Sequence, residues 1–232
     1  MNPAARSDAT LITGVIAPLA LEARTARPLR RDNWRIAHSG IGPARAQTAA
    51  LSLLAAGAER LLVWGTAGGL VPELRPGTLV VPRLIRDGSG AEHPTDDHWR
   101  DTIRMHLPST IPCVDSALVS VNRPAVDAAD KHALAYQTGA EAVDMEAAAV
   151  AAIAAAWHVP CAALRAIADP FELTLPRCVL DARCDRLLPL ELPLRLIFNP
   201  HDMPALRALA RSFGAARRSL HATAQSLAQA AH

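Results

Sequence analysis

The sequence predicts an α/β fold of three layers, in which helices cover both faces of a central, mostly parallel mixed β-sheet. Short apolar runs alternate with glycine-containing loops and helix-forming segments along much of the 232-residue chain. The run Cys161–Ala168 is apolar except for one arginine, which is typical of a strand buried on both faces of a parallel sheet. We therefore expect a single domain over residues 1–232, with its core at about residues 11–225.

The composition limits what this domain can contain. Hydrophobic residues make up 50% of the chain but aromatic residues only 3%, so Ala, Leu and Val must fill the core. A net charge of +2 is too mild to indicate a nucleic-acid partner. No apolar stretch approaches the ~20 residues that a membrane-spanning helix needs. The four cysteines lack CxxC spacing and a matching histidine pattern, which predicts reduced thiols in a cytoplasmic protein.

Leu11–Ala17 predicts the first strand of the sheet. The longer apolar stretch to Leu21 could also form the core of a signal peptide, but only Arg6 precedes it, and Glu22 and Arg24 follow it directly. A strand is therefore the better interpretation, and the two charged residues fall in a short segment after it.

Three further segments predict strands, at Trp34–His38, Leu61–Trp64 and Thr78–Val81. After the first of these, Ser39–Gly42 leads into a helix over about Ala44–Ala56, which Gly57 ends as a C-cap. The segment Gly65–Gly69 predicts a loop whose amides could donate hydrogen bonds at a helix start.

The middle of the chain shows the least regular pattern. Arg83–Pro112 predicts a solvated loop, because the histidines and aspartates of His93–His98 repeat no metal-ligand spacing. We therefore predict no metal site. Ile111–Val121 predicts another strand, and Ala125–Tyr136 predicts a helix that ends before Gly139.

The motif Val143–Glu146 opens an alanine-rich segment that predicts a helix from Glu146 to Trp157. Helical spacing places Glu146 on the same face as Val150 and Ile153, so its carboxylate points inward. A buried carboxylate costs free energy unless something binds it, although the helix N-terminus offsets part of that cost. Glu146 is therefore either a cap or a buried ion pair, or it is a group that binds a ligand.

Asp169 stands at the carboxyl end of the predicted strand Cys161–Ala168, because Pro170 ends that strand. In open α/β sheets, ligands bind at this edge. Asp169 and Glu146 thus predict two acidic groups that face one crevice.

The C-terminal part combines an interrupted apolar run with a long helix. Prolines break the apolar run Leu187–Phe198, and Met203–Gln229 predicts one amphipathic helix that carries four arginines. This helix either packs on the sheet or presents its arginines to an anionic membrane surface.

Several motifs of the chain occur, in this order, in the nucleoside phosphorylase and nucleosidase superfamily, which the chain resembles from about Leu11 to Asp169. These motifs are GVIAPLALEAR, SGIG, GTAGGL, VDMEAAAVA and RAIAD. LEAR, the run from GTAGGL to RPGTLVVP and the segment Met203–Arg211 resemble one branch, the hopanoid-associated phosphorylases. The resemblance implies the nucleoside phosphorylase-like fold and a homo-oligomer, commonly a dimer or hexamer.

The resemblance also implies a chemistry. Breaking an N-glycosidic bond builds positive charge on the sugar and negative charge on the leaving base, as in glycoside hydrolysis. Asp169 is implied to act at N7 of a purine and Glu146 at the ribose 2′- and 3′-hydroxyls, with Met145 under the ribose. The same motifs imply further substrate-binding residues: Asp144, Thr66, Ala67 and Gly68. As an acid, Asp169 needs a pKa well above the reference value of about 3.9, and desolvation and the nearby Glu146 are expected to raise it.

The nucleophile stays open between water and phosphate. Glu22 occupies the motif position of the glutamate that holds the attacking water in nucleosidases. Arg24 and the amide of Gly42 are the candidates for binding phosphate, because a guanidinium and helix-start amides match its oxygens. A second phosphate arginine of bacterial purine nucleoside phosphorylases is Val63 here, which favours water, whereas the branch resembled is one of phosphorylases.

Two positions depart from the superfamily pattern. Ala168 replaces a serine that usually precedes the catalytic aspartate, and Arg123-Pro124 replaces the aromatic residue that stacks on the base. A ring could come instead from one of three other residues: Trp64, Trp99 or Phe171.

We therefore expect an enzyme that cleaves the N-glycosidic bond of a 5′-modified adenosine, adenosylhopane of hopanoid biosynthesis, and releases adenine by phosphorolysis. Inorganic phosphate would be its co-substrate, and no cofactor is expected. The alternatives are a methylthioadenosine or adenosylhomocysteine nucleosidase that uses water, and a non-catalytic nucleoside-binding protein. Leu187–Phe198 would line an opening for the hopane, and the enzyme would be cytoplasmic, with peripheral contact at the inner membrane face.

Overall fold

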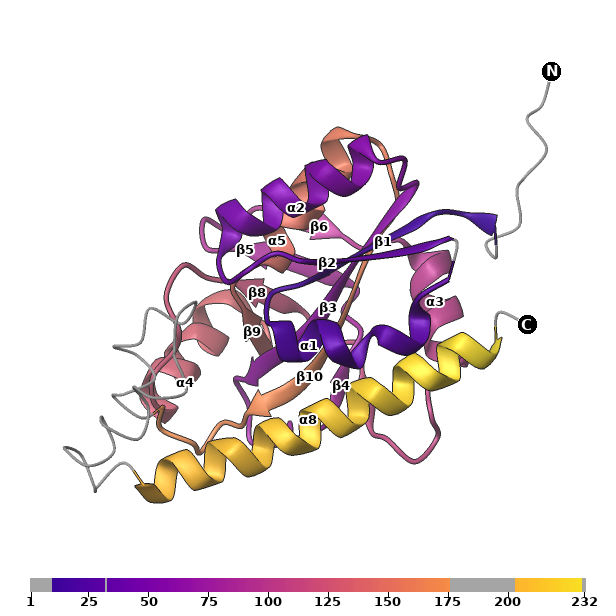
Figure 1. Cartoon of the computed structure of the whole chain (residues 1–232). Coiled ribbons are helices and arrows are strands. Elements are labelled where there is room, and N and C mark those ends of the chain that lie inside the picture. The colour runs from indigo at the N-terminus through magenta and orange to yellow at the C-terminus, as the bar shows by residue number, and fades with distance from the viewer. Residues whose placement is uncertain (1–9, 32, 176–202, 231–232) are drawn as a thin grey trace.

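The computed structural model describes residues 10–31, 33–175 and 203–230. A ten-stranded sheet lies at its centre (Figure 1). The strands are β1 Thr13–Ala17, β2 Trp34–His38, β3 Arg60–Gly69, β4 Leu79–Val80, β5 Leu84–Asp87, β6 Glu92–Pro94, β7 Cys113–Val114, β8 Leu118–Ser120, β9 Ala142–Asp144 and β10 Cys161–Asp169. The helices are α1 Ala20–Thr25, α2 Pro43–Ala55, α3 Asp97–Met105, α4 Ala128–Thr138, α5 Ala147–Ala156 and α8 Met203–Ala230, with a 3-10 turn at Arg27–Leu29.

The sheet is organised around β3. β10 pairs with it in parallel along most of its length, β1 pairs in parallel with its first half, and β9 pairs antiparallel with its last two residues. Among the described strands, six pairings are parallel and three are antiparallel. This confirms the predicted mixed, mostly parallel sheet.

Helices cover both faces of this sheet, as Figure 1 shows. On one face, α2 and α5 pack with Leu61 and Val63 of β3 in one apolar cluster. On the other face, α8 packs with Leu62 and Trp64 in a second cluster. Successive side chains of a strand point to opposite faces, so the unbroken apolar run in β3 serves both clusters. The three-layer α/β/α fold is therefore confirmed.

Most predicted elements are present, with ends shifted by three residues or fewer. The confirmed elements are β1, β2, α2, β4, α4, α5, β10 and α8. The segment Gly65–Gly69 is an exception, because it continues β3 rather than forming a loop at a helix start. Its backbone groups pair with β10 and β9, which stabilises the extended conformation although three of the five residues are glycine.

The prediction of a solvated loop over Arg83–Pro112 was wrong, since this segment contains β5, β6 and α3. The side chain of Asp96 caps α3 by accepting a hydrogen bond from the amide of Trp99 at 2.8 Å. Trp99 and Ile103 are buried in the core, which stabilises the helix. The strand predicted over Ile111–Val121 is divided into the two short strands β7 and β8.

Two of the cysteines lie within the described residues. Cys113 is half-buried and Cys161 is buried, and both are free thiols. The apolar run Leu187–Phe198 lies outside the described residues, as do the other two cysteines. No helix in the part of the chain that the structure describes is both long and apolar enough to cross a bilayer.

Candidate functional site

Glu22 lies on α1, and a chain of buried hydrogen bonds anchors this short helix to β3. The indole N–H of Trp64 donates to the hydroxyl of Thr25 at 2.9 Å, and that hydroxyl donates to the carbonyl of Glu22 at 2.7 Å. Trp64 is fully buried, so these bonds are shielded from water. The position of Glu22 is therefore fixed by the core of the sheet.

The carboxylate of Glu22 is buried and accepts three hydrogen bonds. Oε1 accepts from the amide of Thr66 at 2.7 Å and from its hydroxyl at 2.6 Å, and Oε2 accepts from the amide of Leu19 at 2.9 Å. Burial raises the pKa of Glu22, while the positive charge of Arg165 and these hydrogen bonds oppose the rise. Glu22 and Thr66, both predicted site residues, thus meet directly.

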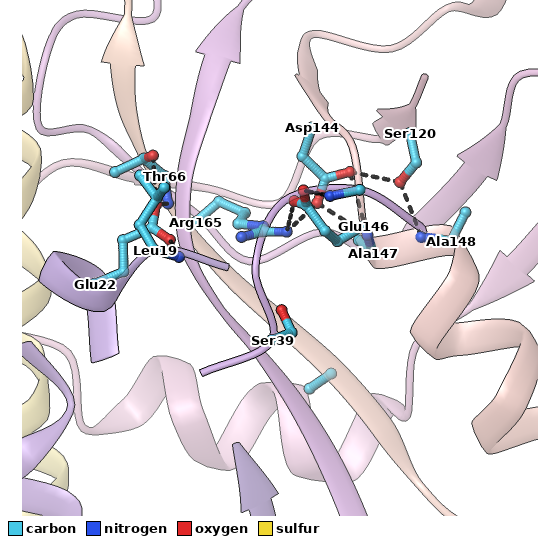
Figure 2. A network of polar contacts seen from close by, with 12 residues as sticks. Leu19, Glu22, Ser39, Thr66, Ser120, Asp144, Glu146, Ala147, Ala148 and Arg165 are labelled. Atoms are coloured by element: carbon cyan, nitrogen blue, oxygen red, sulfur yellow. Dashed lines mark hydrogen bonds and ion pairs between the residues drawn. The ribbon is translucent and has the colours of Figure 1, made fainter. Parts of the chain in front are cut away.

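The side chain of Arg165 on β10 is fully buried and lies between two groups of acids (Figure 2). Its Nη2 donates to Asp144 and, at 3.4 Å, to Oε2 of Glu146. Its charge also acts on Glu22, on the other side of the guanidinium. One cation therefore serves three carboxylates.

Gly65 allows the backbone of β3 to approach this ion pair network closely. A Cβ at Gly65 would lie 2.8 Å from Nη1 of Arg165 and 2.8 Å from Oε2 of Glu22. Real Cβ atoms do not approach other atoms this closely, so any side chain here would displace the two charged groups. Nη1 and Nε of Arg165 have no hydrogen-bond partner among the described residues, although both are buried.

Asp144 forms the turn into α5. Its carboxylate accepts hydrogen bonds from Arg165, from the hydroxyl of Ser120 and from the amide of Ala147. The same hydroxyl of Ser120 accepts a hydrogen bond from the amide of Ala148 at 2.8 Å. Because its oxygens are engaged in this way, Asp144 holds Arg165 and the first turn of α5 in place.

Glu146 occupies the N-cap position of α5, one residue before the helix begins. Its Oε1 accepts a hydrogen bond from the amide of Gly42 at 2.9 Å, and Oε2 faces Arg165. Burial, with the nearby charges of Asp144 and Glu22, raises the pKa of Glu146 to about 7, against the lowering effect of Arg165 and Gly42. The predicted inward direction of this carboxylate is therefore confirmed, and a buried ion pair stabilises it.

Asp169 is the last residue of β10, where a β-bulge alters the pairing with β3. Ile167 pairs with Ala67 and Asp169 pairs with Gly68, so Ala168 is the extra residue. Bulges of this kind re-aim the side chain that follows, and they occur next to active sites. Gly68 lies beside both this carboxylate and β9, since a Cβ on it would lie 3.4 Å from Oδ2 of Asp169 and 3.0 Å from Cγ1 of Val143.

Lys131 on α4 is fully buried and lies against Asp169. Its Nζ donates to Oδ1 of Asp169 at 2.8 Å, to the carbonyl of Pro170 at 2.7 Å and to the carbonyl of Leu173 at 2.8 Å. Burial raises the pKa of Asp169 to about 6, although the charge of Lys131 and its hydrogen bond oppose the rise. The predicted upward shift of this pKa is therefore present, but burial causes it and the expected contribution of Glu146 is not among its causes.

A cavity of about 520 Å³ adjoins the site beside Met145. Ser120 and Asn122 contribute to its wall on one side, and Asp87 and His93 contribute on another. The cavity does not include Glu22, Glu146 or Asp169 in its lining, so it lies next to the acidic groups rather than around them. Within the described residues, no group of three or more His, Cys, Asp or Glu could hold a metal ion.

Some predicted residues lie apart from this arrangement. Arg24 is exposed. It follows Glu22 by two residues on α1, which corresponds to a rotation of about 200° around the helix axis, so its side chain points away from Glu22 and from the predicted phosphate site. The amide of Gly42 is already engaged by Glu146. Trp64 and Trp99, two candidates for stacking on the base, are both buried in the core. The guanidinium carbon of Arg60 lies 4.5 Å from the centroid of the Trp99 ring.

The sequence interpretation missed two residues, Arg165 and Lys131. Arg165 is the one charged residue within the apolar run of β10, and a charge inside a strand buried on both faces requires buried partners of opposite sign. Lys131 is the single lysine among the 24 basic residues of the chain. These two compositional signals were visible before the fold was known, although neither identifies its partner.

The family model described as "Phosphorylase superfamily" matches residues 29–175, which is more than half of the chain. No curated protein matches the sequence significantly. Several solved structures are similar, at identities that show the fold alone.

One is futalosine hydrolase of Helicobacter pylori, with 18% identity, a TM-score of 0.69, and 92% of this chain and 97% of that chain covered. A second is 5′-methylthioadenosine/S-adenosylhomocysteine nucleosidase from Helicobacter pylori with butyl-thio-DADMe-Immucillin-A, with 18% identity, a TM-score of 0.71, and coverage of 94% and 96%. A third is such a nucleosidase from Colwellia psychrerythraea in complex with adenine, with 17% identity, a TM-score of 0.63, and coverage of 70% and 84%.

Proposed function

The chain belongs to the phosphorylase superfamily, and we propose that it is an enzyme that cleaves the N-glycosidic bond of a purine nucleoside. In this proposal Asp169 gives a proton to the leaving base, Glu146 accepts hydrogen bonds from the ribose hydroxyls, and Met145 packs against the sugar. Glu22 and Arg165 hold the nucleophile.

The observation that carries this proposal is the pairing of Asp169, Gly68 and Val143 across three adjacent strands. Gly68 pairs with Asp169 on one side and with Val143 on the other. Neighbouring strands lie about 4.8 Å apart, so Asp169 is about 10 Å from the start of the segment that ends in Glu146. This separation suits one nucleoside held at its base by one acid and at its sugar by the other.

Water is the nucleophile that the geometry favours. A water molecule beside Gly65 could accept hydrogen bonds from Nε or Nη1 of Arg165, which have no partner within residues 10–31, 33–175 and 203–230, and donate to Glu22. Glu22 would then take its proton during attack on the anomeric carbon, and a raised pKa suits a general base. An ionised Glu22 would also repel a phosphate dianion at the same place.

Phosphorolysis is the second candidate, and the same two unpaired nitrogens of Arg165 support it. A guanidinium edge matches two oxygens of an oxyanion. Phosphate would require Glu22 to be protonated, which its raised pKa favours. Inorganic phosphate would then be the co-substrate.

For the substrate we propose a 5′-modified adenosine, with adenosylhopane as the specific candidate on the strength of the sequence resemblance. The cavity beside Met145 has room for a substituent that leaves the sugar on that side. A methylthioadenosine-type substrate would occupy less of it. A homo-oligomer and a peripheral contact with the membrane belong to the same proposal.

Product analysis tests these proposals together. The enzyme is incubated with adenosylhopane or methylthioadenosine in ¹⁸O-labelled water, with and without phosphate, and the products are identified by mass spectrometry. Hydrolysis gives adenine and a sugar that carries ¹⁸O at C1, whereas phosphorolysis gives a sugar 1-phosphate only when phosphate is present. Binding of the nucleosides without release of adenine would refute an enzymatic role and support a binding protein.

Asp169→Asn tests the role of the acid. It keeps the shape of the side chain but removes the proton that the leaving base receives, so adenine release should fall by about 10²–10⁴-fold. Asp101→Asn, on the exposed surface of α3, is the control and should leave the rate within a few-fold of the original.

A further inference from the structure

The only lysine of this chain is fully buried. Lysine and arginine together number 24, and every basic residue except Lys131 is arginine. Lys131 lies on α4 with a fully buried side chain, whereas lysine is almost never buried unless it is paired. Such a position requires partners whose hydrogen bonds and charge offset the free energy lost when the ammonium group leaves water.

That partner set is complete in the structure. The three N–H donors of the ammonium group have three acceptors: Oδ1 of Asp169 at 2.8 Å and the carbonyls of Pro170 and Leu173 at 2.7 and 2.8 Å. A compact ammonium can direct its donors to three converging acceptors, whereas a planar guanidinium cannot. The two carbonyls belong to the turn that directly follows Asp169, so Lys131 holds both the carboxyl group and its backbone.

The contacts of Lys131 leave one oxygen of Asp169 available. Lys131 engages Oδ1, while Oδ2 lies on the side of Gly68, where a Cβ would be 3.4 Å from it. Oδ2 is therefore the oxygen that can carry a proton toward a bound base.

We propose that Lys131 is a positioning residue that orients the carboxyl group of Asp169 and sets its acidity, so that Oδ2 delivers the proton to the leaving base. The inference rests on the proposed function of Asp169. In the step itself, the Oδ2–H bond breaks and a bond from hydrogen to the base nitrogen forms, while the electron pair of the glycosidic bond stays with the base. The ammonium group of Lys131 then stabilises the carboxylate that remains, and water re-protonates it after the product leaves.

Other charged groups do not compete for this role among the described residues. Lys131 is the one charged group that shifts the pKa of Asp169, whereas Glu22, Glu146 and Arg165 act on one another. Glu172, in the turn after β10, pairs with Arg75 at 3.8 Å. On α4, the carboxylates of Asp127 and Asp130 accept hydrogen bonds from backbone amides near the start of that helix.

A simpler role is a structural clamp, in which Lys131 only fixes the turn over Pro170–Leu173. Both roles predict that substitution lowers stability and activity, so those measurements do not separate them. They differ in one respect, because only in the proposed role does the rate of the reaction depend on how the ammonium group sets the ionisation of Asp169.

The presence of a single lysine makes a direct test possible in the unaltered protein. Labelling with [¹⁵Nζ]lysine should give one side-chain ammonium signal, and we follow it by NMR as the pH is raised without substrate. The signal should shift with a midpoint near the pKa of Asp169, about 6, and this transition should be missing in Asp169→Asn. A signal that does not change with pH, or that shows the same transition in Asp169→Asn, would overturn the inference.

The pH–rate profile of Lys131→Gln gives a second readout. Because a protonated Asp169 is required, the rate should fall as the pH rises through about 6 in the original enzyme. Removing the charge that lowers this pKa should move the fall to higher pH by about 1–3 units and reduce the maximal rate. A clamp would lower the rate at every pH and leave the midpoint unmoved.

The two experiments also separate the inference from the proposed function. The NMR titration needs no substrate and no correctly folded variant of Lys131. A linked titration without adenine release would leave the Lys131–Asp169 coupling intact and refute the proposed reaction. Adenine release without a linked titration would support the proposed reaction and refute the Lys131–Asp169 coupling.

Discussion

Nη2 of Arg165 lies 3.4 Å from Oε2 of Glu146, and the same nitrogen donates to Asp144. One guanidinium on β10 thus holds two carboxylates from the short segment that joins β9 to α5. All three side chains are buried, so water does not screen their charges. The stability of this protein should therefore depend strongly on this cation.

Arg165→Met should lower the free energy of unfolding by about 3–5 kcal/mol, because it leaves buried carboxylates without their cation. Urea denaturation measures the change. Arg83→Met is the control, since Arg83 pairs with Asp115 on the surface at 2.6 Å and its loss should change little. Equal effects of the two substitutions would contradict the importance of burial at this site.

Glu146→Gln should make the protein more stable at high pH while it abolishes the proposed sugar contact. The pKa of Glu146 is about 7 in the folded protein and 4.5 without its surroundings, so folding favours the protonated form. The contribution of Glu146 to stability is therefore complete below about pH 4.5 and is lost as the pH rises through about 7.

The glutamine variant lacks this loss, so its advantage should grow between pH 5 and pH 8 to about 1–3 kcal/mol. Urea denaturation at both pH values measures it. Gln137→Glu, on the exposed surface of α4, controls for a charge change of the same size away from the site. An advantage for Glu146→Gln that is the same at pH 5 and pH 8 would show that the carboxyl group does not titrate in this range.

Gly65→Ala should disturb the site without adding any polar group. The new methyl group would lie 2.8 Å from Arg165 and Glu22 and would force these side chains apart. We expect a loss of stability of about 1–3 kcal/mol, typical of overpacking, together with a large loss of activity.

Gly90→Ala is the matched control, because Gly90 also has a positive φ, +91°, but no atom within 4 Å of the added carbon. Its effect isolates the cost of the backbone conformation. If the two alanine variants have the same activity, close contact at Gly65 is unimportant for the site.

The long helix α8 predicts association with anionic membranes. Arg207, Arg211 and Arg218 are exposed and recur at intervals of four and seven residues, so they share one side of the helix. The protein should pellet with vesicles that contain anionic lipid and remain in solution with neutral vesicles. Replacing the three arginines with serine should abolish pelleting, whereas no pelleting of the unaltered protein would refute the prediction.

The positions of Glu22, Glu146 and Asp169 were predictable to a useful degree from local patterns. Apolar runs defined β1 and β10, and the residues that follow such runs lie at the strand ends where a sheet binds ligands. The alanine-rich α5 placed Glu146 at a helix start. Local patterns failed in Arg83–Pro112, where the strands are three and four residues long and too short to show a period.

The amino-acid sequence alone determined the fold class, most of the elements outside Arg83–Pro112 and the acidic residues at the edge of the sheet, because burial imposes a period that is readable over a few neighbouring residues. Only the tertiary structure decided the partners of those acids. Arg165 meets Asp144 across 21 positions of the chain, and Lys131 meets Asp169 across 38. Contacts at such separations depend on how the strands and helices pack together, and no local period records them.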